Sequence, residues 1–580
     1  MSIKLNRSLL RLAFGTFKER KYAWLFSILC AVVLPFLDIA ITGSIYLLFT
    51  EDKRAKVILF LDKYLQSLKI TFLQETLNQQ IFVVAVGVIL VLFTLALKYR
   101  NKLVIGELRE FFAVADAQRL ISNFLATSTM RARQVSKERV TSSILHDCGS
   151  RENYARNLVE LGSAGIGLVL YGIGAIAVSW KIVGVVVVIY LTPFLITRRI
   201  YSTVEKLSRK QIRLREQVIH QVREVGDSIE RARTDGLEKH LGDQTLNTVV
   251  RQKRKNLDMV RTKAKFSTIF DGFGQVQLLL VVFGSTAILQ QQILALLILL
   301  IVFAKLQGYF GRITGGLQSI NMASTKVDRF NSLMSLVETP DSMRYFGRAV
   351  ADAPPLREIK LHNVSFGYLE GSPILKNFSM ELKAGDKLLL SGASGIGKST
   401  LLEIIGGLLV PDQGEVEFNQ EVLSGELFQK LRGQICFVTP NVYIFDNSVR
   451  YNLSPAHVVG EDELWSALEK VGLHDFVGRK PQGLDMPVGP NGSELSTGQR
   501  QRLVLARAFI QKPTVLILDE FTANLDLVTE THIINVVNEL ISPESITVMA
   551  AHKLPSGFSP TRVLDLEEKG AAAFDRRSDH

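Results

Sequence analysis

Long apolar runs separated by charged stretches dominate the first half of the chain. Six of them approach the length of about 20 residues that a helix needs to cross a bilayer. These runs cover residues 23–49, 81–97, 161–179, 182–197, 267–289 and 293–310. Only Trp180 and Lys181 separate the third run from the fourth, which predicts a tight hairpin outside the membrane. The pattern therefore predicts a bundle of six transmembrane helices, with both ends of the chain on one side of the membrane.

Two long charged stretches between these runs, 99–158 and 198–266, contain no proline and are rich in Leu, Val, Glu, Lys and Arg. They predict helices that continue beyond the membrane, because about 25 helical residues reach nearly 40 Å. Such helices are long enough to touch a separate domain. At the tips of these stretches, near 146–152 and 223–231, the chain contains a glycine, which indicates either a short crossing or a plain turn.

The pattern changes after Pro354-Pro355 to short β-rich runs and glycine-containing turns, with no further run of membrane length. Leu388–Ser391 and Val515–Leu518 are each typical of a buried strand. We therefore predict three parts. They are a transmembrane domain of six helices at 1–335, a linker at 336–356 and an α/β domain at 357–580.

Charge supports a membrane location. The 580 residues include 68 Lys and Arg against 56 Asp and Glu, a formal net charge of +12. Many of the basic residues flank the apolar runs, above all in 198–266, as in the cytoplasmic loops of membrane proteins. This distribution predicts a multi-pass protein of the cytoplasmic (inner) membrane, with the second half and both termini in the cytoplasm. The three cysteines form no CxxC pair, so neither a disulfide framework nor a zinc site is indicated.

A glycine-rich loop follows the first of the two strands and precedes an apolar helix. Its sequence is Gly392-Ala393-Ser394-Gly395-Ile396-Gly397-Lys398-Ser399-Thr400. This matches the phosphate-binding pattern GxxxxGK[ST] in the strand–loop–helix context that the pattern requires. The glycines let backbone N–H groups surround phosphate oxygens, and the helix N-terminus adds a favourable potential. We expect Lys398 to reach the β- and γ-phosphates and Ser399 to bind Mg²⁺.

Two adjacent carboxylates, Asp519 and Glu520, end the second strand. In a P-loop ATPase, one carboxylate at this place holds Mg²⁺ and the next polarises the attacking water. We expect Asp519 to take the first role and Glu520 the second.

A third motif makes the similarity specific. Leu495-Ser496-Thr497-Gly498-Gln499-Arg500-Gln501-Arg502 resembles the LSGGQ signature of ATP-binding cassette (ABC) proteins, with Thr497 in place of a glycine. Residues 360–567 resemble the cassette, and nearly the whole chain resembles an ABC exporter half-transporter. The resemblance implies a membrane α-helical bundle of six helices with long cytoplasmic extensions, fused to an α/β P-loop ATPase domain. It implies ATP and Mg²⁺ as cofactors.

The resemblance assigns further residues one by one. Tyr368 resembles the aromatic residue that stacks on adenine, and His552 resembles the switch histidine that contacts the γ-phosphate. Asp526 lies in a segment that resembles the D-loop. Asn441 stands where the family has a glutamine that meets the nucleotide and Mg²⁺, and its side chain is one methylene shorter. Pro490 replaces the glutamate that usually precedes the signature, which alters an expected interdomain contact.

The signature loop also indicates the assembly. It opens a helix whose N-terminal amides can hold a γ-phosphate. In the family this loop completes the P-loop site of another cassette, so Ser496, Thr497, Gly498 and Gln499 are expected to bind a partner's nucleotide. One chain has one cassette, which implies a dimer. Glu520 and His552 are both present, which favours a homodimer over a heterodimer with one degenerate site.

An acidic residue, Asp38, lies inside the first apolar run. A carboxylate in hydrocarbon costs about 2.5–3.5 kcal/mol on insertion scales, so Asp38 is expected to face a partner group or a watery cavity. Asp38 either contacts the substrate or a cation, or it has a structural role, as a hydrogen bond between helices or as a residue near the outer interface.

These observations together predict an ATP-driven exporter or flippase that alternates between inward- and outward-facing states. The expected substrate is amphipathic: a lipid, a glycolipid or a peptide. The alternatives are a regulatory ABC ATPase that transports nothing, and a multidrug or peptide exporter that works as a heterodimer. A P-loop ATPase that acts on DNA is disfavoured by the six apolar runs, so the expected partners are a second chain, membrane lipid and substrate, without nucleic acid.

Overall fold

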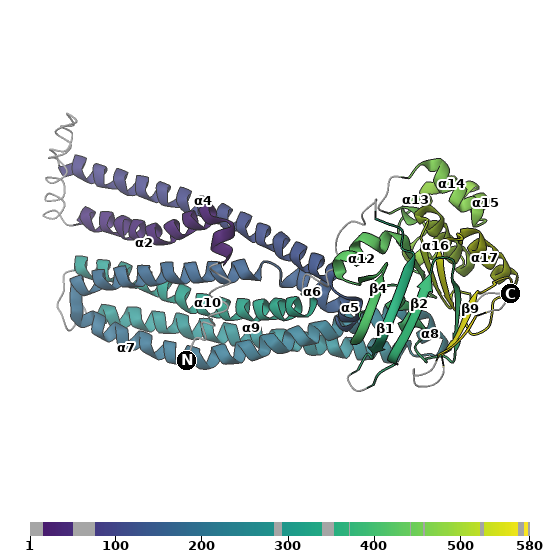
Figure 1. Cartoon of the computed structure of the whole chain (residues 1–580). Coiled ribbons are helices and arrows are strands. Elements are labelled where there is room, and N and C mark those ends of the chain that lie inside the picture. Colours follow the sequence, from purple (N-terminus) through teal and green to yellow (C-terminus); the bar gives the residue numbers. More distant parts are fainter. Residues whose placement is uncertain are drawn as a thin grey trace, which may run out of the picture. The chain divides into compact units, whose positions relative to one another are not determined.

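The computed structural model describes residues 15–49, 76–283, 293–338, 353–369, 372–440, 442–455, 459–522, 527–566 and 573–577. The chain divides into two compact units. The first takes in residues 1–121 and 135–336, and the second takes in residues 122–134 and 337–580. Figure 1 shows long helices in the first unit and two β-sheets with surrounding helices in the second.

The helices of the first unit follow the predicted apolar runs. They are α2 (Lys21–Phe49), α4 (Thr76–Ala126), α6 (Lys137–His146), α7 (Ser150–Asp227), α8 (Ile229–Thr234), α9 (Glu238–Phe283) and α10 (Ile293–Val337). Among the described residues, three stretches are long and apolar enough to cross a membrane: Lys21–Leu48, Gln79–Ala126 and Lys137–Ile176. The predicted spans at 182–197, 267–289 and 293–310 lie wholly or partly among residues whose side chains the structure does not describe.

The longest helical segment, α7, contains two predicted spans and must fold back on itself. Arg329 Nη2 lies 3.5 Å from Asp147, just before α7, and 2.8 Å from Glu216, near its end. If the residues between Ser150 and Glu216 formed one straight helix, these carboxylates would be about 100 Å apart. The fold-back agrees with the predicted hairpin. The predicted turn itself, at 180–181, lies among residues whose side chains are not described.

Buried polar contacts fix the beginning of α7 against α4. Asp116, which is fully buried, accepts a hydrogen bond from the Gly149 backbone N–H at 3.0 Å and forms an ion pair with Arg151. Gly149 has a φ of +77°, and a Cβ there would approach Ala113 Cβ to 3.3 Å. In the predicted crossing at 146–152, Asp147 and residues 149–152 are buried inside the helical unit, whereas His146 is exposed. Residues 122–134 belong to the second unit.

The second unit contains two sheets. A four-stranded antiparallel sheet has the order β2-β1-β4-β5, and a six-stranded sheet has the order β10-β9-β3-β8-β7-β6. The antiparallel strands are β1 (Glu358–Phe366), β2 (Leu375–Lys383), β4 (Gln413–Phe418) and β5 (Glu421–Val422). The larger sheet is formed by β3 (Lys387–Gly392), β6 (Ile435–Val438), β7 (Val515–Asp519), β8 (Ile546–Ala550), β9 (Arg562–Leu566) and β10 (Ala573–Arg577).

Short helices surround these sheets. They are α5 (Thr129–Gln134), α11 (Lys398–Ile405), α12 (Gly425–Leu431), α13 (Val449–Leu453), α14 (Glu461–Lys470), α15 (His474–Gly478), α16 (Thr497–Gln511) and α17 (Leu527–Leu540). Three 3₁₀ turns are η4 (Arg432–Gln434), η5 (Gly483–Asp485) and η6 (Pro490–Gly492).

The six-stranded sheet positions the candidate site. All residues of β7 and β8 are buried, as expected for parallel strands covered on both faces. Ala550 is paired with Leu390 of β3 on one side and with Asp519 of β7 on the other. Since the three strands are parallel, the residues that follow them emerge at one edge of the sheet. The glycine-rich loop, Glu520 and His552 therefore lie together.

Candidate functional site

The loop between β3 and α11 has the backbone geometry that its glycines predict. Gly392, Gly395 and Gly397 have φ angles of 140°, 82° and 114°, which side chains rarely allow. A Cβ at Gly397 would lie 2.6 Å from Ile374 Cγ2, and one at Gly392 would lie 2.8 Å from the carbonyl oxygen of Leu566. The loop then enters α11 at Lys398. This is a cradle for an anion at a helix N-terminus.

Lys398 is held at the centre of this cradle. Its side chain is 4% exposed, and its ammonium donates to the carbonyl oxygens of Gly392 at 2.8 Å and Ala393 at 3.3 Å. The same ammonium lies 3.2 Å from Glu520 Oε1. Lys398 therefore connects the phosphate-binding loop to the acidic end of β7.

Glu520 and His552 converge as the sequence predicts. His552 Nε2 lies 3.2 Å from Glu520 Oε1, the oxygen that also contacts Lys398. The backbone of Glu520 is strained, with a φ of +40°, and its N–H donates to the Ala550 carbonyl oxygen at 3.0 Å. The Glu520 carboxylate, a candidate base, thus lies beside the loop together with Lys398 and His552, which can both stabilise negative charge.

Asp519 and Ser399 form the part of the site that could hold a metal ion. Asp519 is 6% exposed, and its Oδ1 has no hydrogen-bond partner among the described residues. Burial raises the pKa of Asp519, although a hydrogen bond with Ser399 acts in the opposite direction. Within the described part of the chain, no group of three or more His, Cys, Asp or Glu residues could hold a metal. One carboxylate and one hydroxyl fit Mg²⁺, which keeps several waters and takes few protein ligands.

Tyr368 lies after β1, on the side of the loop near the start of α11. Its side chain is partly exposed, its ring meets Phe366 edge-on at 5.2 Å, and its hydroxyl is 3.4 Å from Thr400 Oγ1. The structure therefore brings the predicted adenine-stacking residue to the phosphate-binding loop.

The signature residues form the start of α16. Ser496 caps this helix and forms a capping box with Gln499: the Gln499 N–H donates to Ser496 Oγ at 3.3 Å, and the Ser496 N–H donates to Gln499 Oε1 at 2.8 Å. Arg500 donates to the Leu495 carbonyl oxygen at 3.0 Å and to Thr497 Oγ1 at 3.1 Å. Among the described residues, no hydrogen bond or ion pair joins residues 496–499 to the phosphate-binding loop.

The three remaining predicted positions, Asn441, Asp526 and Pro490, have different outcomes. Asn441 and Asp526 lie outside the described residues. Pro490 is the first residue of η6, between Gly489 with a φ of +71° and Asn491 with a φ of +52°. The turn is held from α16, because Arg500 Nη1 donates to the Gly492 carbonyl oxygen at 3.3 Å.

The comparisons with known proteins agree with this geometry. Residues 375–523 match the ABC transporter family. A bacterial Atm1-family ABC exporter, solved with ATP bound, superposes with a TM-score of 0.74 at 18% identity, covering 96% of this chain and 95% of that one. The second unit contains an ABC transporter ATP-binding domain, and the chain has the fold of an ABC exporter half-transporter. With its long apolar helices, the chain is a multi-pass membrane protein.

The sequence relatives reported below each match less than half of this chain. An uncharacterised ABC transporter ATP-binding protein of Bacillus subtilis (strain 168) is 31% identical over 45% of this chain and 45% of its own length. The mitochondrial iron-sulfur clusters transporter ABCB7 of Homo sapiens is 29% identical over 41% of this chain and 32% of its own. The match therefore covers less than half of the length of each of these curated relatives.

Sequence reasoning missed one contact of the cassette. Arg133 on α5 forms a two-pronged ion pair with Glu403 on α11, at 3.1 Å and 2.6 Å. The hydrogen bond to Glu403 is the main reason why the pKa of the Arg133 guanidinium is raised, and Tyr368 makes a smaller contribution. Arg133 thus reaches the helix that begins at the phosphate-binding loop. No motif marks it, because Arg133 lies in an ordinary basic stretch 270 residues before its partner.

Asp38 has partners within the helical unit. It is 8% exposed on α2, and the Tyr309 hydroxyl donates to its Oδ2 at 3.0 Å. Lys98 Nζ of α4 lies 3.8 Å from Oδ1, and Lys305 Nζ of α10 lies 3.7 Å from Oδ2. Asp38 therefore links three helices, as one of its two predicted roles requires.

Proposed function

We propose that this protein is an exporter of the cytoplasmic membrane, in which ATP hydrolysis drives an amphipathic lipid, glycolipid or peptide across the bilayer by alternating access. One observation carries the proposal. Glu520 Oε1 lies 3.2 Å from both Lys398 Nζ and His552 Nε2, beside a phosphate-binding loop, in a chain with an exporter fold. These three groups suit the three tasks of ATP hydrolysis, which are to bind the phosphates, to orient the attacking water and to stabilise the charge of the γ-phosphate.

The residues would divide the work as follows. Lys398 and the loop amides bind the β- and γ-phosphates, while Tyr368 stacks on the adenine. Glu520 orients a water molecule and takes its proton as the water oxygen attacks the γ-phosphorus and the bond to the ADP oxygen breaks. His552 donates to the γ-phosphate and stabilises its charge. Ser399 and Asp519, with Asn441, would hold Mg²⁺, which neutralises phosphate charge when bound.

A second chain is part of this proposal. Ser496 caps α16, whose first residues are Thr497, Gly498 and Gln499. Among the described residues, none of these four forms a hydrogen bond or ion pair with its own phosphate-binding loop. We infer that they complete the site of a second copy, together with Asp526, and that the assembly is a homodimer. Both sites are then equivalent, because each has Glu520 and His552.

The proposed arrangement keeps the predicted parts. Residues 1–335 form the membrane domain, 336–356 form the linker and 357–580 form the cassette, with the cassette and both termini in the cytoplasm. The basic stretch at 198–266 supports this orientation, because cytoplasmic segments carry the excess of Lys and Arg.

The test is ATPase turnover of the purified chain in lipid vesicles, beside Glu520→Gln. The variant keeps the size of the side chain and loses the base, so turnover is expected to fall by at least about a hundredfold while nucleotide binding persists. Activity that survives in Glu520→Gln would contradict the assigned role. A parent chain with no turnover alone would favour a heterodimer or a regulatory role over the self-sufficient exporter.

A further inference from the structure

A cavity of about 880 Å³ lies among α2, α4, α7 and α10 of the helical unit. Four cationic side chains and one carboxylate line it, so its lining has a formal charge of +3. The charged residues are Lys98, Lys102, Arg156, Arg312 and Glu160. The cationic side chains repel one another, and a bound anion would relieve this repulsion.

The acids of the unit satisfy only part of this charge. Arg156 is paired with Glu160 at 2.9 Å, and Lys98 shares Asp38 with Lys305. Lys102 has no acidic partner in the described part of the chain. For Arg312, the described residues offer only the ring of Tyr309, whose centroid is 4.9 Å away. Lys102 and Arg312 are therefore the two cations available to a ligand.

The remaining lining suits a headgroup joined to an apolar tail. Asn101 Oδ1 is buried and has no hydrogen-bond donor within the described ranges, so it could accept from a ligand hydroxyl. Leucine, isoleucine and valine side chains supply apolar walls, at Leu34, Leu95, Ile105 and Val159. Room remains beside α10 because a Cβ at Gly315 would meet nothing within 4 Å.

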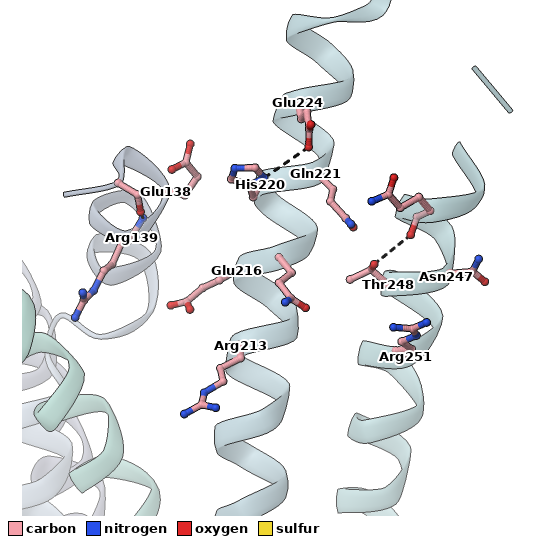
Figure 2. A pocket seen from close by; sticks show the side chains of 13 residues that line it. Glu138, Arg139, Arg213, Glu216, His220, Gln221, Glu224, Asn247, Thr248 and Arg251 are labelled. Carbon is pink, nitrogen blue, oxygen red and sulfur yellow. Dashed lines mark hydrogen bonds and ion pairs between the residues drawn. The ribbon is translucent and has the colours of Figure 1, made fainter. Parts of the chain in front are cut away.

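A second cavity shows that this excess is local and does not follow from the basic composition. The cavity of about 930 Å³ among α6, α7 and α9 is lined by three arginines and three glutamates (Figure 2). These residues are Arg139, Arg213, Arg251, Glu138, Glu216 and Glu224. His220, also in this cavity, lies 3.8 Å from Glu224, an interaction drawn in Figure 2. Charges there balance without a ligand.

The first cavity also lies at the right depth for a lipid. Its α4 lining begins at Leu95, at the end of the predicted span 81–97, and its α10 lining begins at Arg312, just after the predicted span 293–310. Basic residues at span ends are common on the cytoplasmic side. That rule explains their depth, but it does not require residues of three helices to converge on one cavity.

We propose that this cavity binds the anionic headgroup of an amphiphile, with Lys102 and Arg312 as its main contacts and Asn101 as acceptor for a neighbouring hydroxyl. The proposal rests on the proposed exporter function and names the substrate class: an anionic lipid-like molecule that enters from the cytoplasmic leaflet. Lys98 belongs to the same lining and can turn from Asp38 toward the ligand.

The experiment compares ATPase turnover in phosphatidylcholine vesicles with and without phosphatidylglycerol, an anionic lipid whose headgroup carries hydroxyls. Phosphatidylglycerol should stimulate the parent. Arg312→Gln and Lys102→Gln should each raise the lipid content for half-maximal stimulation about tenfold, as for the loss of a hydrogen bond to a charged group. Arg312→Lys should keep most of the response.

The matched control is Arg100→Gln. Arg100 is an exposed cation on α4, two residues from Lys102, and does not line the cavity. Arg100→Gln removes one positive charge, as Arg312→Gln and Lys102→Gln do. An equal loss of stimulation in Arg100→Gln would therefore overturn the proposed binding site in favour of a general effect of surface charge. Soluble glycerol 3-phosphate is the second arm. If it stimulates as strongly as the lipid, the ligand is a free anion and the amphiphile is refuted.

A binding measurement separates this proposal from the exporter function. The lipids that remain on the purified chain are counted by native mass spectrometry after exposure to an equal mixture of the two lipids. Retention of phosphatidylglycerol by the parent and by Arg100→Gln, but not by Arg312→Gln, supports the cavity even if turnover fails. Equal retention in all three proteins overturns it even if Glu520-dependent turnover is found.

Discussion

The ion pair between Arg133 and Glu403 offers a sharp test of how α5 is held in the cassette. Two nitrogen–oxygen distances, 3.1 Å and 2.6 Å, define a two-pronged contact. The Glu403 side chain is 15% exposed, whereas Arg133 is 51% exposed. Arg133→Ala removes the contact, Glu403→Gln weakens it, and the double variant completes a cycle.

The expected magnitude follows from this exposure. A fully exposed ion pair contributes about 0.2–1 kcal/mol, and charged hydrogen bonds contribute about 1.5–3 kcal/mol. Water screens the exposed arginine, so the coupling energy should be about 1 kcal/mol, close to the upper limit for surface pairs. The same energy should weaken nucleotide binding about fivefold, if α11 needs the contact to present its N-terminus.

The assay is thermal unfolding of the full-length protein in detergent, at low and high salt, with nucleotide affinity measured alongside. Arg131→Ala is the control. Arg131 lies on the same short helix, and in the part of the chain that the structure describes it donates only to the backbone carbonyl oxygen of Glu338, at 3.0 Å. Single effects that add to within about 0.3 kcal/mol in the double variant would refute the coupling.

Three further outcomes follow from the cassette. Gly397→Ala should raise the nucleotide dissociation constant at least about tenfold, because the φ of 114° and the 2.6 Å approach to Ile374 distort the loop; unchanged binding of a fluorescent nucleotide would contradict this. Asp519→Asn should abolish turnover yet raise the unfolding temperature at neutral pH. Burial raises the pKa of Asp519, so its charge costs stability above that pKa, and the gain should vanish as the pH falls toward about 4. Cys436 should resist alkylation near pH 8 until the protein unfolds, because burial raises the pKa of its thiol to about 12, and rapid labelling of native protein would disprove this.

The nucleotide site was predictable because its order along the chain is local. A strand, a glycine-rich loop and a helix follow one another at 388–400, so this short segment by itself indicates the phosphate-binding loop. Glu520 and His552 are distant in sequence, yet each follows a buried run that is typical of a strand. Parallel strands end at the same edge, which brings these side chains together without any detailed packing.

Contacts between helices could not be read in the same way. The hydrophobic pattern gives the depth of Asp38 in the membrane but not the direction of its side chain, so Lys98 and Lys305 could not be chosen as partners. The sequence left open a short crossing or a plain turn at Gly149, and it could not indicate that this residue, with its positive φ, packs against Ala113. Such contacts depend on how long helices are rotated against each other, which a single sequence does not specify.

The contacts of Arg329 have a consequence for how the protein is made. This residue contacts Asp147 before α7 and Glu216 near its end, and it lies on α10, after the last predicted span. During synthesis, each apolar run can enter the membrane as soon as it leaves the ribosome. Arg329 itself emerges from the ribosome only after all six apolar runs have been translated. This contact therefore forms only after the last of the six runs has been translated. A chain that ends before Arg329 lacks it, but keeps the ion pair between Arg223 of α7 and Glu138 of α6.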